Sequence, residues 1–368
     1  MSQEKEISAK EKKLRKWMKQ NGYGAVLLSR MANFAWFTCG GDSHVVSASD
    51  NGVAPVLVTP DKKYLIANNI EAGRLSDEEL KGQGFIIKKY NWWEEFRKKE
   101  IIEELVKGVK LASDDGFAGT PNVEGEVARL RFRLLPEEIK RYKWLGRKAG
   151  RAMARVCKKL KKGDTEHSIA GKLGGQLLKD GIMPTVLLVA SDERLLKYRH
   201  PIPQDKKLEE TVMVVVCARK WGLIASLTRI IHFGPVSAEL RKKHNAVLKV
   251  DAAFNLNSKP GASAAEIFAK AQSAYKETGY ADEWMLHHQG GATGYAGRDY
   301  KATPGSKEIV EINQAFAWNP SITGTKSEDT IIVRKDRVEF ITPTPGWPML
   351  SVKVGNETVL RPDILEIN

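Results

Sequence analysis

The pattern of apolar residues changes along the chain, and this change predicts two domains of different architecture. In the first third, short apolar runs alternate with segments of helical spacing. The apolar runs are 25–29, 53–59, 64–67 and 84–90, and the clearest helical segments are 8–21 and 92–107. Strand and helix signals that alternate in this way predict a small α/β domain with a mixed sheet.

From residue 183 onward, the alternating pattern gives way to runs rich in β-branched residues, which favour strands. The strands expected there are 186–190, 211–218 and 223–233, followed by helices at 235–256 and 263–278 and by further strands from 315. We place the domain boundary near residue 134, just before a long helix that begins at Pro136. The prediction is an α+β chain with one domain over 1–134 and another over 135–368. The length of 368 residues suits two domains.

The long helix carries most of the excess positive charge. Segment 136–162 holds eleven Lys and Arg against two Glu, which supplies +9 of the formal net charge of +14. Basic residues recur every four positions from Lys143 to Lys159, while Tyr142 and Met153 fall on another face. A solvated helix face is the favoured interpretation, because no zinc-finger spacing or RNA-binding aromatic motif accompanies the stripe. We therefore expect no nucleic-acid partner.

The cysteines and the hydropathy pattern bear on the cellular compartment. Cys39, Cys157 and Cys217 are odd in number and widely spread, which excludes a disulfide framework and favours a reducing compartment. No apolar run approaches the roughly 18 residues that a membrane-spanning helix needs. The charged N-terminus lacks the apolar stretch of a signal peptide. We expect a cytoplasmic protein with no membrane partner.

Polar residues with possible chemistry gather in four clusters. They are Arg199-His200-Pro201, Ser226-Leu227-Thr228-Arg229, His287 to Gly291 with the following Tyr295 and Arg298, and Asn319-Pro320 with the stretch from Lys326 to Thr330. Each cluster alone is a weak signal, since a lone His is more often a structural hydrogen-bonding group than a catalyst. For that reason we interpret His232 and His244 as structural.

In order and spacing, the clusters resemble the pita-bread superfamily that includes methionine aminopeptidase, aminopeptidase P, prolidase and creatinase. The stretches that carry the resemblance are RHPIP (199–203), VVCARKWGLIASLTR (215–229), HHQGG (287–291), WNPS (318–321) and KSEDTIIV (326–333), with GDTE (163–166) at a helix start. NFAWFTCGG (33–41) resembles a segment of creatinase and prolidase N-terminal domains. The resemblance implies a creatinase-like N-terminal α/β domain and a C-terminal pita-bread domain with a curved antiparallel sheet.

The chain departs from the metallopeptidases of this superfamily at the metal ligands. Those enzymes hold two divalent ions with two Asp, one His and two Glu, because hard cations need anionic oxygen ligands. By resemblance, the five positions fall on Val215, Ser226, His288, Asn319 and Glu328. With a single carboxylate left, we expect no dinuclear metal site and no cofactor. A single zinc held by His200, His288, Glu328 and Cys217 is the less favoured alternative.

Resemblance to creatinase implies that C–N hydrolysis is feasible without a metal ion. His200 would then serve as general base and acid, and Glu328 would orient it or the substrate. Arg229, His288 and Arg298 would bind a carboxylate, and Ser226, Asn319 and Tyr295 would add polar contacts to the substrate. Thr228 stands where creatinase has a Glu, which argues against creatine as the substrate.

The expected function is therefore metal-independent hydrolysis of a C–N bond in a small, polar, carboxylate-bearing metabolite. Two alternatives stay open, a residual Xaa-Pro metallopeptidase and a non-catalytic pita-bread binding module. The resemblance also implies a homodimer in which Phe34, with Trp36 and Phe37, covers the active site of the second copy. The same aromatic residues are equally well explained as ordinary core.

Overall fold

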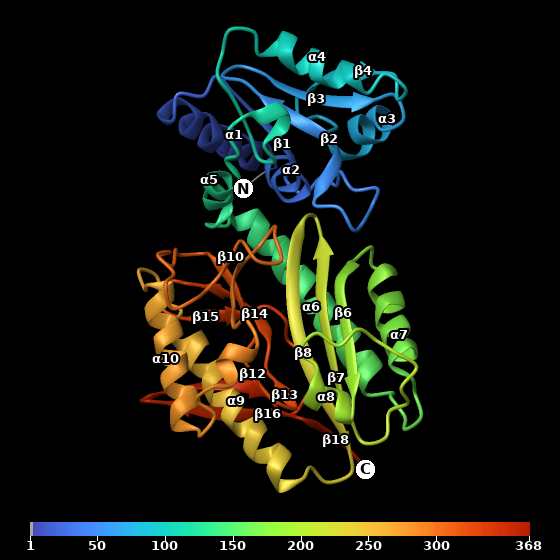
Figure 1. Ribbon diagram of the computed structural model, residues 1–368, viewed down its shortest axis with the longest axis vertical. Coiled ribbons are helices and arrows are strands. Elements are labelled where there is room, and N and C mark those ends of the chain that lie inside the picture. The colour runs from blue at the N-terminus through green and yellow to red at the C-terminus, as the bar shows by residue number, and fades with distance from the viewer. Residues whose placement is uncertain (1–2) are drawn as a thin grey trace. The chain divides into compact units, whose positions relative to one another are not determined.

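The computed structural model describes residues 3–368 (Figure 1). The chain forms two compact units, each with its own core. The first comprises 1–131 with 135–139 and 221–223, and the second comprises 132–134, 140–220 and 224–368. The expected boundary near residue 134 lies within this interleaved stretch. Among the described residues, no helix is long and apolar enough to cross a membrane.

The N-terminal unit is built on a five-stranded mixed sheet in the order β4-β3-β2-β1-β5. Its strands are β1 (Ala25–Arg30), β2 (Asn51–Val58), β3 (Lys63–Asn68), β4 (Ile86–Tyr90) and β5 (Leu111–Ser113). Its helices are α1 (Gln3–Gln20), α2 (Met31–Phe37), α3 (Ala72–Arg74), α4 (Phe96–Leu105) and α5 (Glu124–Arg131), with short turns η1 (Leu75–Glu79) and η2 (Phe117–Gly119).

Both directions of strand pairing occur in this sheet, as the alternating pattern predicted. β1 pairs antiparallel with β2 and parallel with β5, and β3 pairs parallel with β4. Leu27, Leu57, Ile66 and Ile102 are fully buried in one apolar cluster. The alternation of apolar runs and helices therefore identified this domain correctly.

The C-terminal unit contains five helices, two larger sheets and short hairpins. The helices are α6 (Pro136–Cys157), α7 (Glu166–Leu178), α8 (Glu193–Lys197), α9 (Ala238–Asn257) and α10 (Ala264–Glu277), with the short turn η3 (Glu283–Leu286). The strands are β6 (Met183–Ser191), β7 (Thr211–Lys220), β8 (Leu223–Phe233), β9 (Gly290–Thr293), β10 (Tyr300–Lys301), β11 (Ala315–Trp318), β12 (Ser321–Ile322), β13 (Thr325–Lys326), β14 (Asp329–Val333), β15 (Val338–Phe340), β16 (Met349–Val354), β17 (Glu357–Pro362) and β18 (Leu365–Ile367).

The two larger sheets of this unit are joined by an isolated β-bridge and by side-chain hydrogen bonds beside it. One sheet has the order β18-β8-β7-β6 and the other has β10-β9-β11-β14-β15. β6 pairs antiparallel with β7, the neighbouring strands of the second sheet all pair antiparallel, and β18 pairs parallel with β8. Thr228 on β8 forms an antiparallel bridge with Glu328, which directly precedes β14. The expected antiparallel architecture is confirmed, and Figure 1 shows α6 running beside β6, β7 and β8.

The long basic helix is amphipathic, as its spacing predicted. Tyr142, Leu145 and Met153 of α6 are fully buried, whereas Arg147 and Arg151 are exposed. Thus the apolar face packs into the unit and the basic stripe faces solvent.

Candidate functional site

The bridge between the two sheets brings the ends of β8 and β14 together. The Thr228 amide donates a hydrogen bond to the Glu328 carbonyl at 3.1 Å. The Thr228 hydroxyl Oγ1 also donates to Glu328 Oε2 at 2.7 Å. Both side chains are buried, which fixes the carboxylate of Glu328 at the junction of the sheets.

The hairpin of β7 and β8 determines which residue lies opposite Ser226. The strands turn at residues 221–222, and Ser226 Oγ donates a hydrogen bond to Cys217 Sγ at 3.2 Å. The residue opposite Ser226 is therefore Cys217. Val215, the position that the spacing of the resembled motif gives for the first Asp, lies two residues earlier on β7 and is buried in an apolar cluster with Leu188 and Ile230.

Three histidines lie together beside these strands. His200 follows α8, and His287 and His288 follow η3 and precede β9. The Nε2 atoms of His200 and His287 are 3.0 Å apart, within hydrogen-bond distance. The rings of His287 and His288 stack with their centroids 4.5 Å apart. His200 and His288 are expected site residues, whereas His287 is an additional one, for which the His287-His288 doublet is the only sequence signal.

The turn after the histidines requires glycine. Gly290 has φ +98°, and a β-carbon there would lie 2.2 Å from the Ala317 carbonyl oxygen on β11. Asn319, just beyond β11, donates its amide hydrogen to the Gln289 carbonyl at 3.1 Å. Its Oδ1 is buried and has no hydrogen-bond partner among the described residues. The close packing of β9 on β11 thus holds His288 and Asn319 in neighbouring segments.

Cationic groups surround the only carboxylate of the five family ligand positions. Lys326 Nζ lies 2.9 Å from Glu328 Oε2, and Arg298 Nη2 lies 3.4 Å from Glu328 Oε1. Burial alone would raise the pKa of Glu328, but Lys326 and Arg298 outweigh it and lower the pKa. Glu328 is therefore an anion that already has two cationic partners. Lys326 is a site residue to which the sequence analysis gave no role.

The same environment keeps the three imidazoles neutral. Burial is the main cause for each ring, and nearby Lys326 adds to it. The pKa of His287 falls to about 2 and that of His288 to about 4. The pKa of His200 is also lowered, although Glu328 partly opposes the shift. Neutral imidazole nitrogens can accept a proton or bind a cation.

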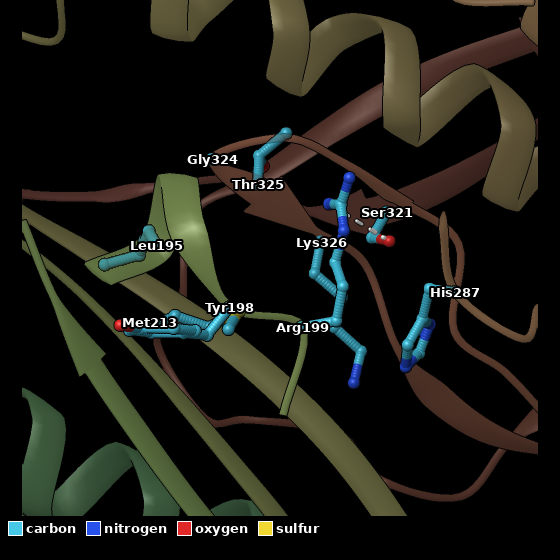
Figure 2. Close-up of a pocket in the computed structure, with 9 residues that line it drawn as sticks. All are labelled: Leu195, Tyr198, Arg199, Met213, His287, Ser321, Gly324, Thr325 and Lys326. Carbon is cyan, nitrogen blue, oxygen red and sulfur yellow. Dashed lines mark hydrogen bonds between the residues drawn. The ribbon is translucent and has the colours of Figure 1, made fainter. Parts of the chain in front are cut away.

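A small pocket lies next to His287. Figure 2 shows its polar residues Arg199, Lys326 and His287 opposite the apolar residues Leu195 and Met213. Arg199 also pairs with Glu283, their Nη2 and Oε2 atoms lying 2.5 Å apart. The pocket therefore has a basic, hydrogen-bonding side and an apolar wall.

Three of the expected substrate-binding residues lie elsewhere or are occupied. Arg229 was expected to bind a carboxylate, but its guanidinium is buried and donates to Asp329 Oδ1 at 2.8 Å and to the Thr342 carbonyl at 3.2 Å. Phe34 is fully buried in α2 of the N-terminal unit, as the core interpretation has it. Tyr295 is buried in the loop after β9, only 2% exposed. Arg229 is therefore not available to bind a substrate carboxylate, whereas the roles expected for Phe34 and Tyr295 stay predictions.

The donor atoms do not fit the two divalent ions of the metallopeptidases. The five positions carry Val215, Ser226, His288, Asn319 and Glu328, so a single carboxylate remains. That carboxylate is paired with two cationic side chains. A pair of divalent ions needs several anionic oxygen ligands to offset its charge. The donor set therefore does not suit chemistry that depends on such a pair.

Comparison with known proteins identifies the family. Metallopeptidase family M24 matches residues 140–335, and the creatinase/prolidase N-terminal domain matches residues 11–117. The chain therefore belongs to the metallopeptidase family M24, with a pita-bread fold preceded by a creatinase-type domain. It is a member of a hydrolase family by descent.

The similar proteins include dipeptidases. The chain is 22% identical over 360 residues to the Xaa-Pro dipeptidase of Pyrococcus horikoshii, covering 92% of this chain and 98% of that protein. It is 26% identical over 235 residues to the Xaa-Pro dipeptidase of Lactobacillus helveticus, and this match spans 61% of the chain and 64% of that protein. The solved Xaa-Pro dipeptidase from Bacillus anthracis superposes with a TM-score of 0.78 at 20% identity, covering 98% and 100% of the two chains. At 20% identity, this structural similarity shows that the two chains share a fold.

Proposed function

We propose that the chain is a metal-independent hydrolase that cleaves a C–N bond in a small, polar, carboxylate-bearing metabolite. The observation that carries the proposal is the contact of His200 with His287, whose Nε2 atoms are 3.0 Å apart, at a site where cations outnumber carboxylates. Family membership supports hydrolysis, and the donor set argues against the family's metal pair.

His200 would move the proton. If His200 donates its Nε2 hydrogen to His287, its Nδ1 keeps a lone pair that can accept a proton from an attacking water. The hydroxide adds to the substrate carbon, the C–N bond breaks, and the same proton passes to the leaving nitrogen. His287 acts as a positioning residue, since its contact fixes the tautomer and ring orientation of His200. His200 is exposed and can therefore reach a ligand.

The charged groups would bind and orient the substrate. Lys326 and Arg298 would hold the substrate carboxylate, and Glu328 would keep both cations in place through its ion pairs. His288 and Asn319 would stabilise charge that develops at the reacting carbon. Hydrogen-bond donors that are preorganised in this way are each worth about 3–4 kcal/mol in a catalytic site.

The test is an activity screen on chelator-treated protein. The compounds are amidino, ureido, amide and Xaa-Pro derivatives, each with a free carboxylate. The proposal expects turnover that survives the chelator, is lost in His200→Ala and persists in the control His167→Ala. His167 suits as a control because its side chain is exposed and its partner Asp205 is also almost fully exposed.

Other outcomes of the screen point to the alternatives. Turnover of Xaa-Pro compounds that disappears with the chelator identifies a residual metallopeptidase, which the dipeptidase relatives favour. The absence of turnover and of any ligand-induced shift in melting temperature identifies a non-catalytic binding module. Either result overturns the proposed function.

A further inference from the structure

We infer that His200, His287 and His288 form a site for one transition-metal ion, and that this ion inhibits the enzyme rather than activating it. The three residues each offer one ring nitrogen, and these nitrogens lie within 4.8 Å of one another. Two of them, His200 and His287, stand outside the five ligand positions of the family. The site is therefore a different one from the carboxylate-bridged pair of the metallopeptidases.

The distances suit a zinc-type ion after small side-chain movements. Zinc binds histidine nitrogen at about 2.0–2.1 Å in tetrahedral geometry, which places the ligand nitrogens about 3.3 Å apart. The Nε2 atoms of His200 and His287 are already 3.0 Å apart. The ring of His288 has its centroid 5.8 Å from that of His200 and 4.5 Å from that of His287. One ion could replace the hydrogen bond between His200 and His287 and gain His288 as its third ligand.

Unpartnered ring nitrogens give independent support for a ligand at this place. The Nδ1 atoms of His287 and His288 are buried and have no hydrogen-bond partner among the described residues. His287 is only 8% exposed, so water does not readily compensate for the missing partner. Buried polar atoms in folded proteins are normally paired, and such exceptions call for an explanation. A cation bound through His288 Nδ1 would supply one for that ring, and His287, which faces His200 with Nε2, would bind the same ion through Nε2.

The surroundings determine which ions fit and how tightly they bind. Imidazole ligands suit zinc, copper, nickel and cobalt, whereas calcium and magnesium prefer oxygen. Three neutral ligands bring no negative charge, and Lys326, Arg298 and Lys301 lie close enough to act on the histidines electrostatically. This repulsion makes the ion weakly held and removable, unlike a resident cofactor.

Inhibition follows from the overlap of this site with the proposed catalytic group, and this part rests on the proposed function. An ion on His200 Nε2 replaces the contact with His287 and leaves the ring hydrogen on Nδ1, so Nδ1 has no lone pair to accept a proton from water. Turnover should therefore fall as the site fills and return when a chelator removes the ion. Ion binding itself does not depend on any substrate, so it can be tested separately.

The experiment is a titration of the chelator-treated full chain with Co²⁺ and Zn²⁺. One equivalent of Co²⁺ should give the intense visible absorption of a tetrahedral site, and Zn²⁺ should displace it. His287→Ala should weaken Zn²⁺ binding by more than about tenfold. Mutating a residue that only supports a metal ligand already lowers metal affinity about 10–100-fold, and His287 would be a ligand itself. His167→Ala, which alters an exposed histidine, should leave the affinity unchanged.

Two results would overturn the metal site. One is the lack of a tetrahedral Co²⁺ spectrum in the unaltered protein, and the other is equal affinity in His287→Ala and the unaltered chain. If His287→Ala does not fold, X-ray absorption of the Zn²⁺-loaded unaltered protein decides, since it should show several imidazole ligands. A metal that binds here but raises turnover would refute the inhibitory role and the metal-free mechanism, and leave the site itself intact.

Discussion

Arg361 on β17 donates from Nη2 to Asp329 Oδ2 at 2.9 Å, one residue beyond the carboxylate at the centre of the candidate site. Arg361 also donates from Nε to Asp251 Oδ2 at 2.6 Å, and both partners are almost completely buried. Arg229 binds the second oxygen of Asp329. This buried network anchors the start of β14 and so holds Glu328 against Thr228.

Removing Arg361 should destabilise the C-terminal unit strongly. Arg361→Met leaves Asp251 without its cationic partner, and breaking a buried ion pair from one side costs about 3–5 kcal/mol. Urea denaturation followed by circular dichroism measures the free energy of unfolding. Lys259→Met is the matched control, because its ion pair with Glu357 is exposed and should contribute less than about 1 kcal/mol. Equal losses in both variants would contradict this role of the network.

The position of Cys217 opposite Ser226 predicts how a metal pair could be restored. Cys217→Asp combined with Ser226→Asp and Asn319→Glu should create a site for Mn²⁺, because these residues would then supply carboxylates near Glu328. Calorimetry with Mn²⁺ and the melting temperature with and without the ion are the measurements. A rise in melting temperature with Mn²⁺ is expected, since the ion offsets repulsion between the new carboxylates.

The control for this variant moves one carboxylate by two positions. Val215→Asp in place of Cys217→Asp puts the charge into an apolar cluster, where Val215 is 2% exposed. That variant should bind no Mn²⁺ and should lose stability through the unpaired buried charge. Comparable Mn²⁺ binding by both variants would show that the strand register assigned here is incorrect.

Much of the fold could be predicted from the sequence, because hydrophobic period and turn residues are local signals. The site was less predictable, because the pairing of strands decides which residues face one another. Counting along a motif gives Val215 as a ligand position, but it does not show that the hairpin turn at 221–222 places Cys217 opposite Ser226. Side chains alternate between the two faces of a strand. This alternation along β8 could have predicted that Arg229 and Thr228 lie on opposite faces of the sheet. The contact between His200 and His287 joins residues 87 positions apart, and no local signal predicts it.

His244 should make stability depend on pH in the acid range. Burial lowers its pKa to about 4, although Asp363 opposes the shift, and Nδ1 contacts Thr325 Oγ1 at 2.8 Å. The unfolded chain binds a proton near the ordinary pKa of about 6.5, so stability falls as pH drops from there toward 4. At about 1.4 kcal/mol per pH unit, the loss reaches about 3 kcal/mol.

The comparison with His244→Gln isolates this contribution from those of other groups. Urea denaturation of both proteins at several pH values gives the two curves. The difference in stability between them should be constant above pH about 6.5 and should shrink below it, because only the unaltered protein has this histidine to protonate. Parallel curves over the whole range would exclude His244 as the source.

Lys326→Met tests the carboxylate-binding role of the basic side of the pocket. Lys326 is buried beside His287, and a hydrogen bond to a charged group contributes about 1.5–3 kcal/mol. For a carboxylate-bearing substrate found in the activity screen, KM should rise about tenfold or more. The amide analogue of the same substrate should show little change, because it lacks the negative charge. Lys335→Met, an exposed lysine away from the histidines, serves as the control. Equal effects on the carboxylate and its amide would show that Lys326 acts only by holding Glu328.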